Sequence, residues 1–217
     1  MKLSRLFENC LNAKYVQVEN AVNYSVERVC STLYVYFEWS KGCADWKNNL
    51  DFPAKPYKRM GDEIWFAHRG FLRAWKTVES YVSDSVTDRA IKKVVTVGYS
   101  HGAALAALCH EYVWFNRPDL RDRIEGYGFG CPRVLWGVRT KRLAQRWGRF
   151  LVIRNINDLV THLPPAVFGF SHVGELLEIG ERRKYGMIDA HPPENILAEL
   201  YNYEVLSCQS GARECLH

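Results

Sequence analysis

The feature that most constrains the fold is a buried strand that turns directly into an alanine-rich helix. Residues 94–112 read VVTVGYSHGAALAALCHEY, and the β-branched run ends at Gly98. Such a run is typical of a strand buried on both faces of a parallel sheet. The helical segment after Ser100 ends before Pro118, which cannot continue a helix. This stretch therefore predicts a strand–turn–helix unit of an α/β domain.

Patterns along the rest of the chain extend this alternation. Strands are predicted at 24–30, 31–39, 63–68, 92–99, 123–131 and 149–158, and helices at 1–20, 70–86, 103–115, 139–148 and 192–203. Residues 40–59 read as a long polar loop, and residues 171–189 alternate like a hairpin. The alternation favours an α/β fold with a mostly parallel central sheet flanked by helices. With 217 residues and no internal repeat, the chain is expected to form a single domain, residues 1–217.

Composition excludes several classes of protein. A hydrophobic content of 47% and a charged content of 24% are those of a globular domain with a core. No apolar run approaches the roughly 18–20 residues of a membrane-spanning helix, so no transmembrane segment is expected. The net charge of +5 is spread along the chain without a nucleic-acid-binding motif, so no nucleic-acid partner is expected. A transient contact with a lipid surface stays an alternative.

The N-terminus and the cysteines indicate a cytoplasmic location. Arg5, Glu8 and Asn9 interrupt the apolar run that a secretory signal needs. The seven cysteines are an odd number and include no C-x-x-C pair, which argues against a disulfide framework and a zinc site. A reducing compartment fits this pattern, and a secreted protein whose signal has been removed is the alternative.

Gly98-Tyr99-Ser100-His101-Gly102 matches the G-x-S-x-G turn that carries a nucleophilic serine. Between a buried strand and a helix, this turn holds Oγ above the sheet in a strained backbone, and the glycines remove Cβ atoms that would clash. The helix begins here, so the backbone N–H of His101 is a natural donor to an oxyanion. The alternative is a structural turn that contains serine by chance.

A serine nucleophile also needs a histidine base and an orienting acid, which follow it in the order acid, then histidine. Asp158 ends the predicted strand 149–158, where parallel sheets place functional groups, although aspartate also favours turns. His101 and His110 lie on the helix after the serine, and His217 is the last residue. Three histidines stay open as the base on these grounds: His162, His172 and His191.

Five separated segments resemble the class 3 (fungal-type) lipases of the α/β-hydrolase superfamily. They are LYVYFEWSKGCADWKNNLDF, AHRGFLRAW, VTVGYSHGAALAAL, YGFGCPRV and RNINDLVTHLPPAVFGFSHVGELLEI. They occur in the family's order, from about residue 34 to the last helix. The resemblance implies an α/β-hydrolase fold and a carboxylic ester hydrolase that works through an acyl-enzyme.

The resemblance also assigns residues. Ser100 matches the nucleophile and Asp158 the acid of a catalytic triad. His191 matches the base, because MIDAHPPENILAEL fits the family's base-bearing segment before the last helix. The family's counterpart of His172 lies on a strand below the site, and His162 falls in the family's Pro-Pro loop. Both therefore rank behind His191.

Residues 39–56 resemble the family's oxyanion loop and lid. Ser40 matches the second oxyanion donor, beside His101. Trp39 replaces a glycine of the family, and we expect Trp39, Trp46 and Tyr99 to contact substrate or lid. The lid-like stretch GCADWKNNL is polar, whereas an interfacial lipase needs an apolar lid face, so short-chain esters are expected substrates beside acylglycerols.

The resulting hypothesis is a serine ester hydrolase that needs no metal ion and no organic cofactor. Its partner is an acyl ester or lipid substrate. A phospholipase, thioesterase or acyltransferase would use the same triad and is the first alternative. A catalytically inactive lipid-binding member of the family is the second.

Overall fold

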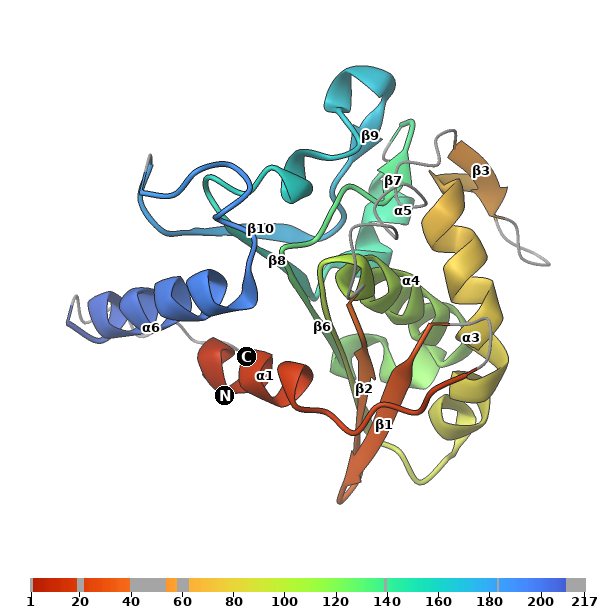
Figure 1. Cartoon of the computed structure of the whole chain (residues 1–217). Helices are drawn as coiled ribbons and strands as arrows, with labels where there is room; N and C mark the ends of the chain where they lie inside the picture. Colours follow the sequence, from red (N-terminus) through yellow and green to blue (C-terminus); the bar gives the residue numbers. More distant parts are fainter. Residues whose placement is uncertain are drawn as a thin grey trace.

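The computed structural model describes residues 2–18, 22–39, 54–57, 63–138, 140–182 and 184–209. Its central sheet has the strand order β1-β2-β5-β6-β8-β10 (Figure 1). The strands are β1 (Tyr24–Val29), β2 (Thr32–Phe37), β5 (Lys93–Tyr99), β6 (Ile124–Phe129), β8 (Phe150–Asn155) and β10 (Glu175–Ile179). The β1–β2 pair is antiparallel, and the other four pairs are parallel. The predicted mostly parallel sheet is therefore confirmed.

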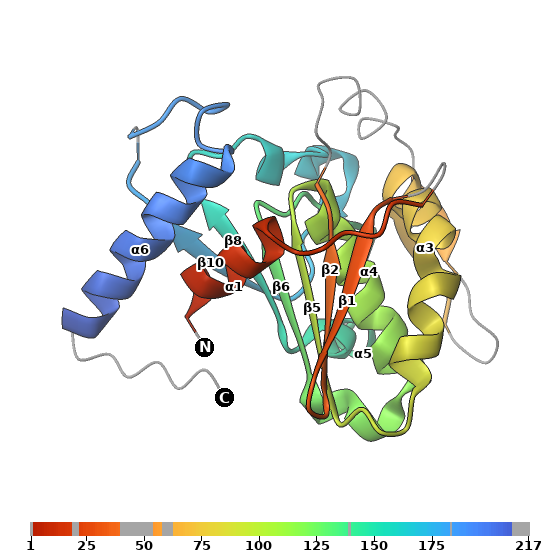
Figure 2. The same cartoon turned by 60° about the horizontal axis from the view of Figure 1, so that its bottom comes forward.

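Helices cover both faces of this sheet, as two views show (Figure 1, Figure 2). One face carries α3 (Arg69–Thr87), α4 (His101–Asn116) and α5 (Lys141–Ala144), and the other carries α1 (Leu3–Leu11) and α6 (Pro193–Gln209). Alternate residues of β5 point to the two cores, since Val94 belongs to the first and Val95 to the second. Small buried side chains let α4 pack closely on the sheet, namely those of Ala103, Ala104, Ala106 and Ala107.

A second, antiparallel sheet lies beside the first, with the order β3-β4-β7-β9. Its strands are β3 (Ala54–Tyr57), β4 (Trp65–His68), β7 (Leu135–Trp136) and β9 (Phe170–Ser171). The sequence predicted only β4. The strands β7 and β9 have two residues each, which is too short to show alternation. In β3, which falls within the predicted polar loop, Pro56 is tolerated because the strand is at the edge of its sheet.

The predicted hairpin over 171–189 is wrong. β10 pairs in parallel with β8, and the described residues that follow it form turns. Gly174 permits this pairing, because a Cβ there would lie 2.0 Å from the carbonyl oxygen of Phe150 and its φ is +66°. The alternation of apolar and polar residues in β10 shows that one face of the strand is buried, but it does not identify the partner strand. The predicted helix over 139–148 is also shorter, with α5 followed by a 3-10 turn, Gln145–Trp147.

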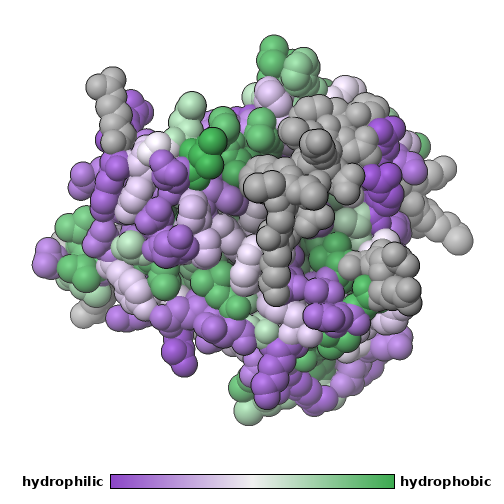
Figure 3. Space-filling model, viewed as in Figure 1, coloured by the Kyte–Doolittle hydropathy of each residue, from purple (hydrophilic) through white to green (hydrophobic). Residues whose placement is uncertain are grey.

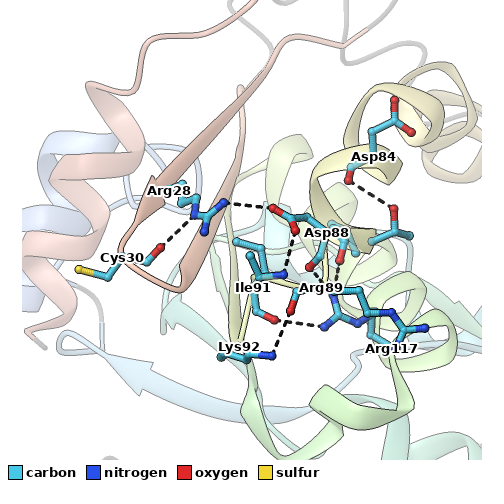
Figure 4. A network of polar contacts seen from close by, with 11 residues as sticks. Arg28, Cys30, Asp84, Asp88, Arg89, Ile91, Lys92 and Arg117 are labelled. Atoms are coloured by element: carbon cyan, nitrogen blue, oxygen red, sulfur yellow. Dashed lines mark hydrogen bonds and ion pairs between the residues drawn. The ribbon is translucent and has the colours of Figure 1, made fainter.

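A buried arginine fixes the connection from α3 to β5 at the end of the sheet remote from Ser100 (Figure 4). The Arg117 guanidinium donates to the carbonyl oxygens of Val86 at 2.7 Å, Asp88 at 3.0 Å and Ile91 at 3.1 Å. Hydrogen bonds to the Asp119 carboxylate raise the pKa of Arg117, despite the opposing effect of burial. The guanidinium thus satisfies three carbonyl groups of the turn and holds the start of the strand that leads to Ser100.

Two further observations concern the chemical environment of the chain. In the ranges that the structure describes, no helix is both long and apolar enough to cross a membrane. The described cysteines are not disulfide-bonded: Cys10, Cys30, Cys109, Cys131 and Cys208. The single-domain arrangement over residues 1–217 stays a prediction.

Candidate active site

The turn between β5 and α4 has the strained geometry that its sequence predicts. Ser100 has φ +55° and ψ −122°, a backbone conformation that costs on the order of 1–3 kcal/mol and is held by its surroundings. A Cβ on Gly98 would lie 2.1 Å from the carbonyl oxygen of Gly102. A Cβ on Gly102 would lie 2.3 Å from the carbonyl oxygen of Phe37 at the end of β2. Both positions therefore require glycine, and the helix begins in close contact with the strand beside it.

Ser100, His191 and Asp158 form a hydrogen-bonded relay at the carboxyl ends of β5 and β8. His191 Nε2 lies 2.8 Å from Ser100 Oγ, and His191 Nδ1 lies 2.8 Å from Asp158 Oδ2. The other carboxylate oxygen, Asp158 Oδ1, accepts from the backbone N–H of Val160 at 2.9 Å. Asp158 is fully buried, while Ser100 and His191 are 8% and 9% exposed. This geometry suits proton transfer from the serine to the histidine, with the carboxylate fixing the ring.

A buried carboxylate on α6 anchors the segment that carries His191. Glu199 is 2% exposed, and its Oε1 lies 2.6 Å from Lys184 Nζ and accepts from the Tyr185 hydroxyl at 3.1 Å. Burial acts to raise the pKa of Glu199, but hydrogen bonds from Lys184, Tyr185 and Asn202 outweigh it and lower that pKa. The contacts of the Glu199 carboxylate with Lys184 and Tyr185 are therefore intact above the ordinary glutamate pKa. They are lost as the pH falls through the lowered pKa of Glu199.

Gly130 leaves the space in which the imidazole and the carboxylate meet. Its φ is +57°, and a Cβ there would lie 3.0 Å from His191 Cε1 and 3.3 Å from Asp158 Oδ2. We expect Gly130→Ala to lower kcat on a soluble ester by about 10- to 100-fold, because it displaces the ring by a fraction of an ångström. Steady-state kinetics alongside thermal unfolding would measure this.

The matched control for Gly130 is Gly137→Ala. Gly137 also has a positive φ, +89°, but a Cβ there would meet nothing within 4 Å. This variant should lose stability from the backbone strain and keep its kcat. Equal kcat values for the two variants would contradict the role given to Gly130.

The other two histidines considered as the base, His162 and His172, lie on other segments of the chain. The carbonyl oxygens of His162 and Pro164 accept hydrogen bonds from the Arg133 guanidinium. His172 lies between β9 and β10, where burial, together with the charges of Arg133 and Arg154, lowers its pKa to about 4. The imidazole that contacts both the serine and the aspartate is that of His191.

His101 and His110 both lie on α4. The His101 ring is 5.5 Å from the ring of Phe71 on α3, so it faces the neighbouring helix. His110 is buried, and burial lowers its pKa to about 3. The backbone N–H of His101 stands at the first position of α4, where amide groups have no partner within the helix. Its predicted role as an oxyanion donor fits that position.

The predicted substrate and lid residues are placed only in part. Ser40, Trp46 and most of the 39–56 loop lie outside the described residues. Tyr99 is 3% exposed, and its ring lies 5.2 Å from the His191 ring and 5.7 Å from that of Trp39. Its side chain therefore packs against the histidine. The predicted contact of Tyr99 with substrate or lid stays a prediction. Among the described residues, no group of three or more His, Cys, Asp or Glu could hold a metal ion.

Comparison with known proteins identifies the family. The family model described as lipase (class 3) matches residues 34–168, which is more than half of the chain. The chain belongs to the class 3 lipases. It is 31% identical to a lipase of Rhizomucor miehei over 193 residues, covering 83% of this chain and 48% of that protein. It is 29% identical to the secreted mono- and diacylglycerol lipase 1 of Fusarium solani, covering 73% of this chain and 44% of that protein. This class 3 lipase chain thus spans about half the length of the curated relatives it matches.

Solved structures agree with the family and the fold. The Rhizomucor miehei triacylglyceride lipase superposes with a TM-score of 0.62 at 26% identity, covering 77% of this chain and 67% of that one. A triacylglycerol lipase whose catalytic centre is described as a serine protease triad superposes with a TM-score of 0.62 at 27% identity, covering 77% and 66%. The α/β-hydrolase fold implied by the sequence is therefore confirmed.

Proposed function

We propose that this class 3 lipase chain hydrolyses carboxylic esters with Ser100 as the nucleophile. The observation that carries the proposal is the relay in which His191 lies 2.8 Å from both the Ser100 hydroxyl and the Asp158 carboxylate. A serine hydroxyl is a weak nucleophile unless a base stands within hydrogen-bond reach and a third group orients that base. His191 meets the first requirement and Asp158 the second.

The proposed reaction follows from these contacts. Ser100 Oγ attacks the acyl carbonyl carbon while His191 Nε2 accepts the hydroxyl proton. Asp158 orients the imidazole and stabilises its charged form. The backbone N–H of His101 is the proposed donor to the oxyanion, with Ser40 as the second donor that the family resemblance implies. His191 then returns the proton to the leaving alcohol. Water then attacks the acyl-enzyme with the same histidine as base. No step calls for a metal ion or an organic cofactor.

The surface around the relay supports a lipid ester as substrate. Exposed apolar side chains follow Asp158 and precede His191, and we call them the apolar edge: Leu159, Val167, Phe168, Met187 and Ile188. The backbone N–H of Leu159 donates to the carbonyl oxygen of Met187 at 3.0 Å, which joins two parts of this edge. In Figure 3, hydrophobic surface lies along the upper part of the molecule, including the turn before β9. A transient contact with a lipid surface fits this edge.

We therefore propose acylglycerols and shorter-chain esters as substrates. One relative is named as a mono- and diacylglycerol lipase and a solved neighbour as a triacylglyceride lipase. A phospholipase, thioesterase or acyltransferase would share the triad and is distinguished by its substrate profile. The cytoplasmic location stays a prediction, while the relative from Fusarium solani is named as secreted.

An ester series tests this function. We expect release of p-nitrophenol from acetate and butyrate esters at least as fast as from emulsified palmitate, because the lid-like loop is polar in sequence. A strong preference for emulsified long-chain esters would contradict that expectation. Absence of turnover on every ester, thioester and phospholipid would favour an inactive lipid-binding protein.

The same assay tests the apolar edge. The double variant Met187→Ser/Ile188→Ser should lose activity on vesicle-borne esters about tenfold more than on soluble acetate, since it removes two exposed apolar side chains. The matched control is Val205→Ser/Leu206→Ser, which removes two exposed apolar side chains from α6. If the ratio of activity on vesicle-borne esters to activity on soluble acetate were the same for the two variants, it would count against a lipid contact at this edge.

A further inference from the structure

Tyr99, the residue before the nucleophile, has a side chain that no step of the proposed reaction uses. It is the last residue of β5 and pairs with Phe129 of β6, so its backbone is fixed within the central sheet. Its ring packs on three others. It stacks on His191 with 5.2 Å between ring centres and 27° between planes, meets Phe7 of α1 edge-on at 5.4 Å, and lies 5.7 Å from Trp39.

The Tyr99 hydroxyl makes one short hydrogen bond, to the base-bearing residue itself. It donates to the backbone carbonyl oxygen of His191 at 2.6 Å, in a buried setting. Burial and the charges of Asp158 and Glu194 raise the pKa of Tyr99, so the phenol keeps its proton and stays a donor. A single side chain thus holds His191 at two points, the carbonyl oxygen through the hydroxyl and the imidazole through the ring.

This double contact has a mechanical consequence. His191 follows the turns that connect β10 to α6, whereas Tyr99 stands in a strand paired on both sides. We propose that Tyr99 is a positioning residue, which transfers the rigidity of the central sheet to the catalytic base and keeps its imidazole between Ser100 and Asp158. The inference rests on the proposed function and adds a residue to its machinery.

The ring contact also has an electrostatic consequence. His191 becomes an imidazolium when it accepts the Ser100 proton, and the face of a phenol ring attracts a cation through its quadrupole. The attraction is stronger after the proton has moved than before. Loss of the ring should therefore reduce kcat rather than weaken substrate binding.

The experiment compares Tyr99→Phe and Tyr99→Leu on a soluble p-nitrophenyl ester. Tyr99→Phe removes the hydroxyl alone and should lower kcat about three- to tenfold, the equivalent of one hydrogen bond. Tyr99→Leu also removes the ring and should lower kcat about 100-fold. KM should stay within about twofold of the wild-type value in both. Inactivation of Ser100 by a fluorophosphonate should slow by the same factors.

The matched control is Tyr127→Phe on the neighbouring strand β6. Its hydroxyl donates to Glu125 at 3.3 Å, so the variant also loses one hydrogen bond of a partly buried tyrosine. It should keep the wild-type kcat. A wild-type kcat in Tyr99→Phe, or a change confined to KM, would overturn the inference.

A spectroscopic readout separates this inference from the proposed function. The proton between His191 Nδ1 and Asp158 should give a downfield proton resonance, sharp in the wild type and in Tyr127→Phe. In Tyr99→Phe the same resonance should broaden or disappear, because the backbone of His191 loses the hydrogen bond that fixes it and the imidazole is held by the ring contact alone. If the wild type turns over no ester, the proposed function fails, and this resonance still decides the inference. An unchanged resonance in Tyr99→Phe would refute it.

Discussion

The Ser100→Ala variant is expected to lose ester hydrolysis by a factor on the order of 10⁶ in kcat, because removing the nucleophile of a triad disables the whole unit. The fold should persist, since the Ser100 side chain is small and its described hydrogen bond is to His191. Initial rates on a soluble p-nitrophenyl ester, with protein at high concentration, give the residual activity.

A buried serine away from the relay provides the control for this variant. Ser25 on β1 is 7% exposed, and Ser25→Ala should keep the wild-type kcat. Thermal unfolding of both variants shows whether they fold. A folded Ser100→Ala variant that retains more than about 1% of the wild-type rate would contradict a role as nucleophile.

The His191→Ala variant is expected to have the second large effect. Its kcat should fall by a factor on the order of 10⁶, since nucleophile and base act as one unit and their losses do not add. The informative comparison is His172→Ala. His172 lies between β9 and β10, and its pKa is lowered to about 4, so it is neutral at neutral pH.

We expect His172→Ala to lower kcat less than about tenfold, through small changes in packing. The two variants should be compared at equal folded fraction, measured by thermal unfolding. If His172→Ala abolished turnover and His191→Ala did not, the base would be misassigned. The double variant Ser100→Ala/His191→Ala should have a kcat no lower than that of Ser100→Ala alone.

The parts of the site that sequence reasoning could predict are those encoded locally. The strained turn follows from five consecutive residues, because Gly98 and Gly102 are the positions where a Cβ would strike backbone atoms. Asp158 could be proposed because it ends the predicted strand 149–158, although β8 itself ends at Asn155. His191 lies 91 residues from Ser100 and 33 from Asp158, and its choice over two other histidines depended on resemblance to a family.

The features that the sequence did not predict depend on contacts between distant segments. β10 alternates like a hairpin strand, yet its partner is β8, and the absence of a Cβ at Gly174 permits the close approach to Phe150. The second sheet combines strands of two to four residues from four parts of the chain. Tyr99 was expected to contact substrate or lid, and its contact with His191 joins residues that are 92 positions apart.

The most direct test of the account is the site of covalent modification by an active-site fluorophosphonate. The folded protein is treated with the reagent, digested, and mapped by mass spectrometry. We predict one adduct, on Ser100, that is absent from Ser100→Ala and forms more slowly in His191→Ala. Folded wild-type protein that takes no adduct, or takes it on a different residue, would contradict the claim that this turn carries a working nucleophile.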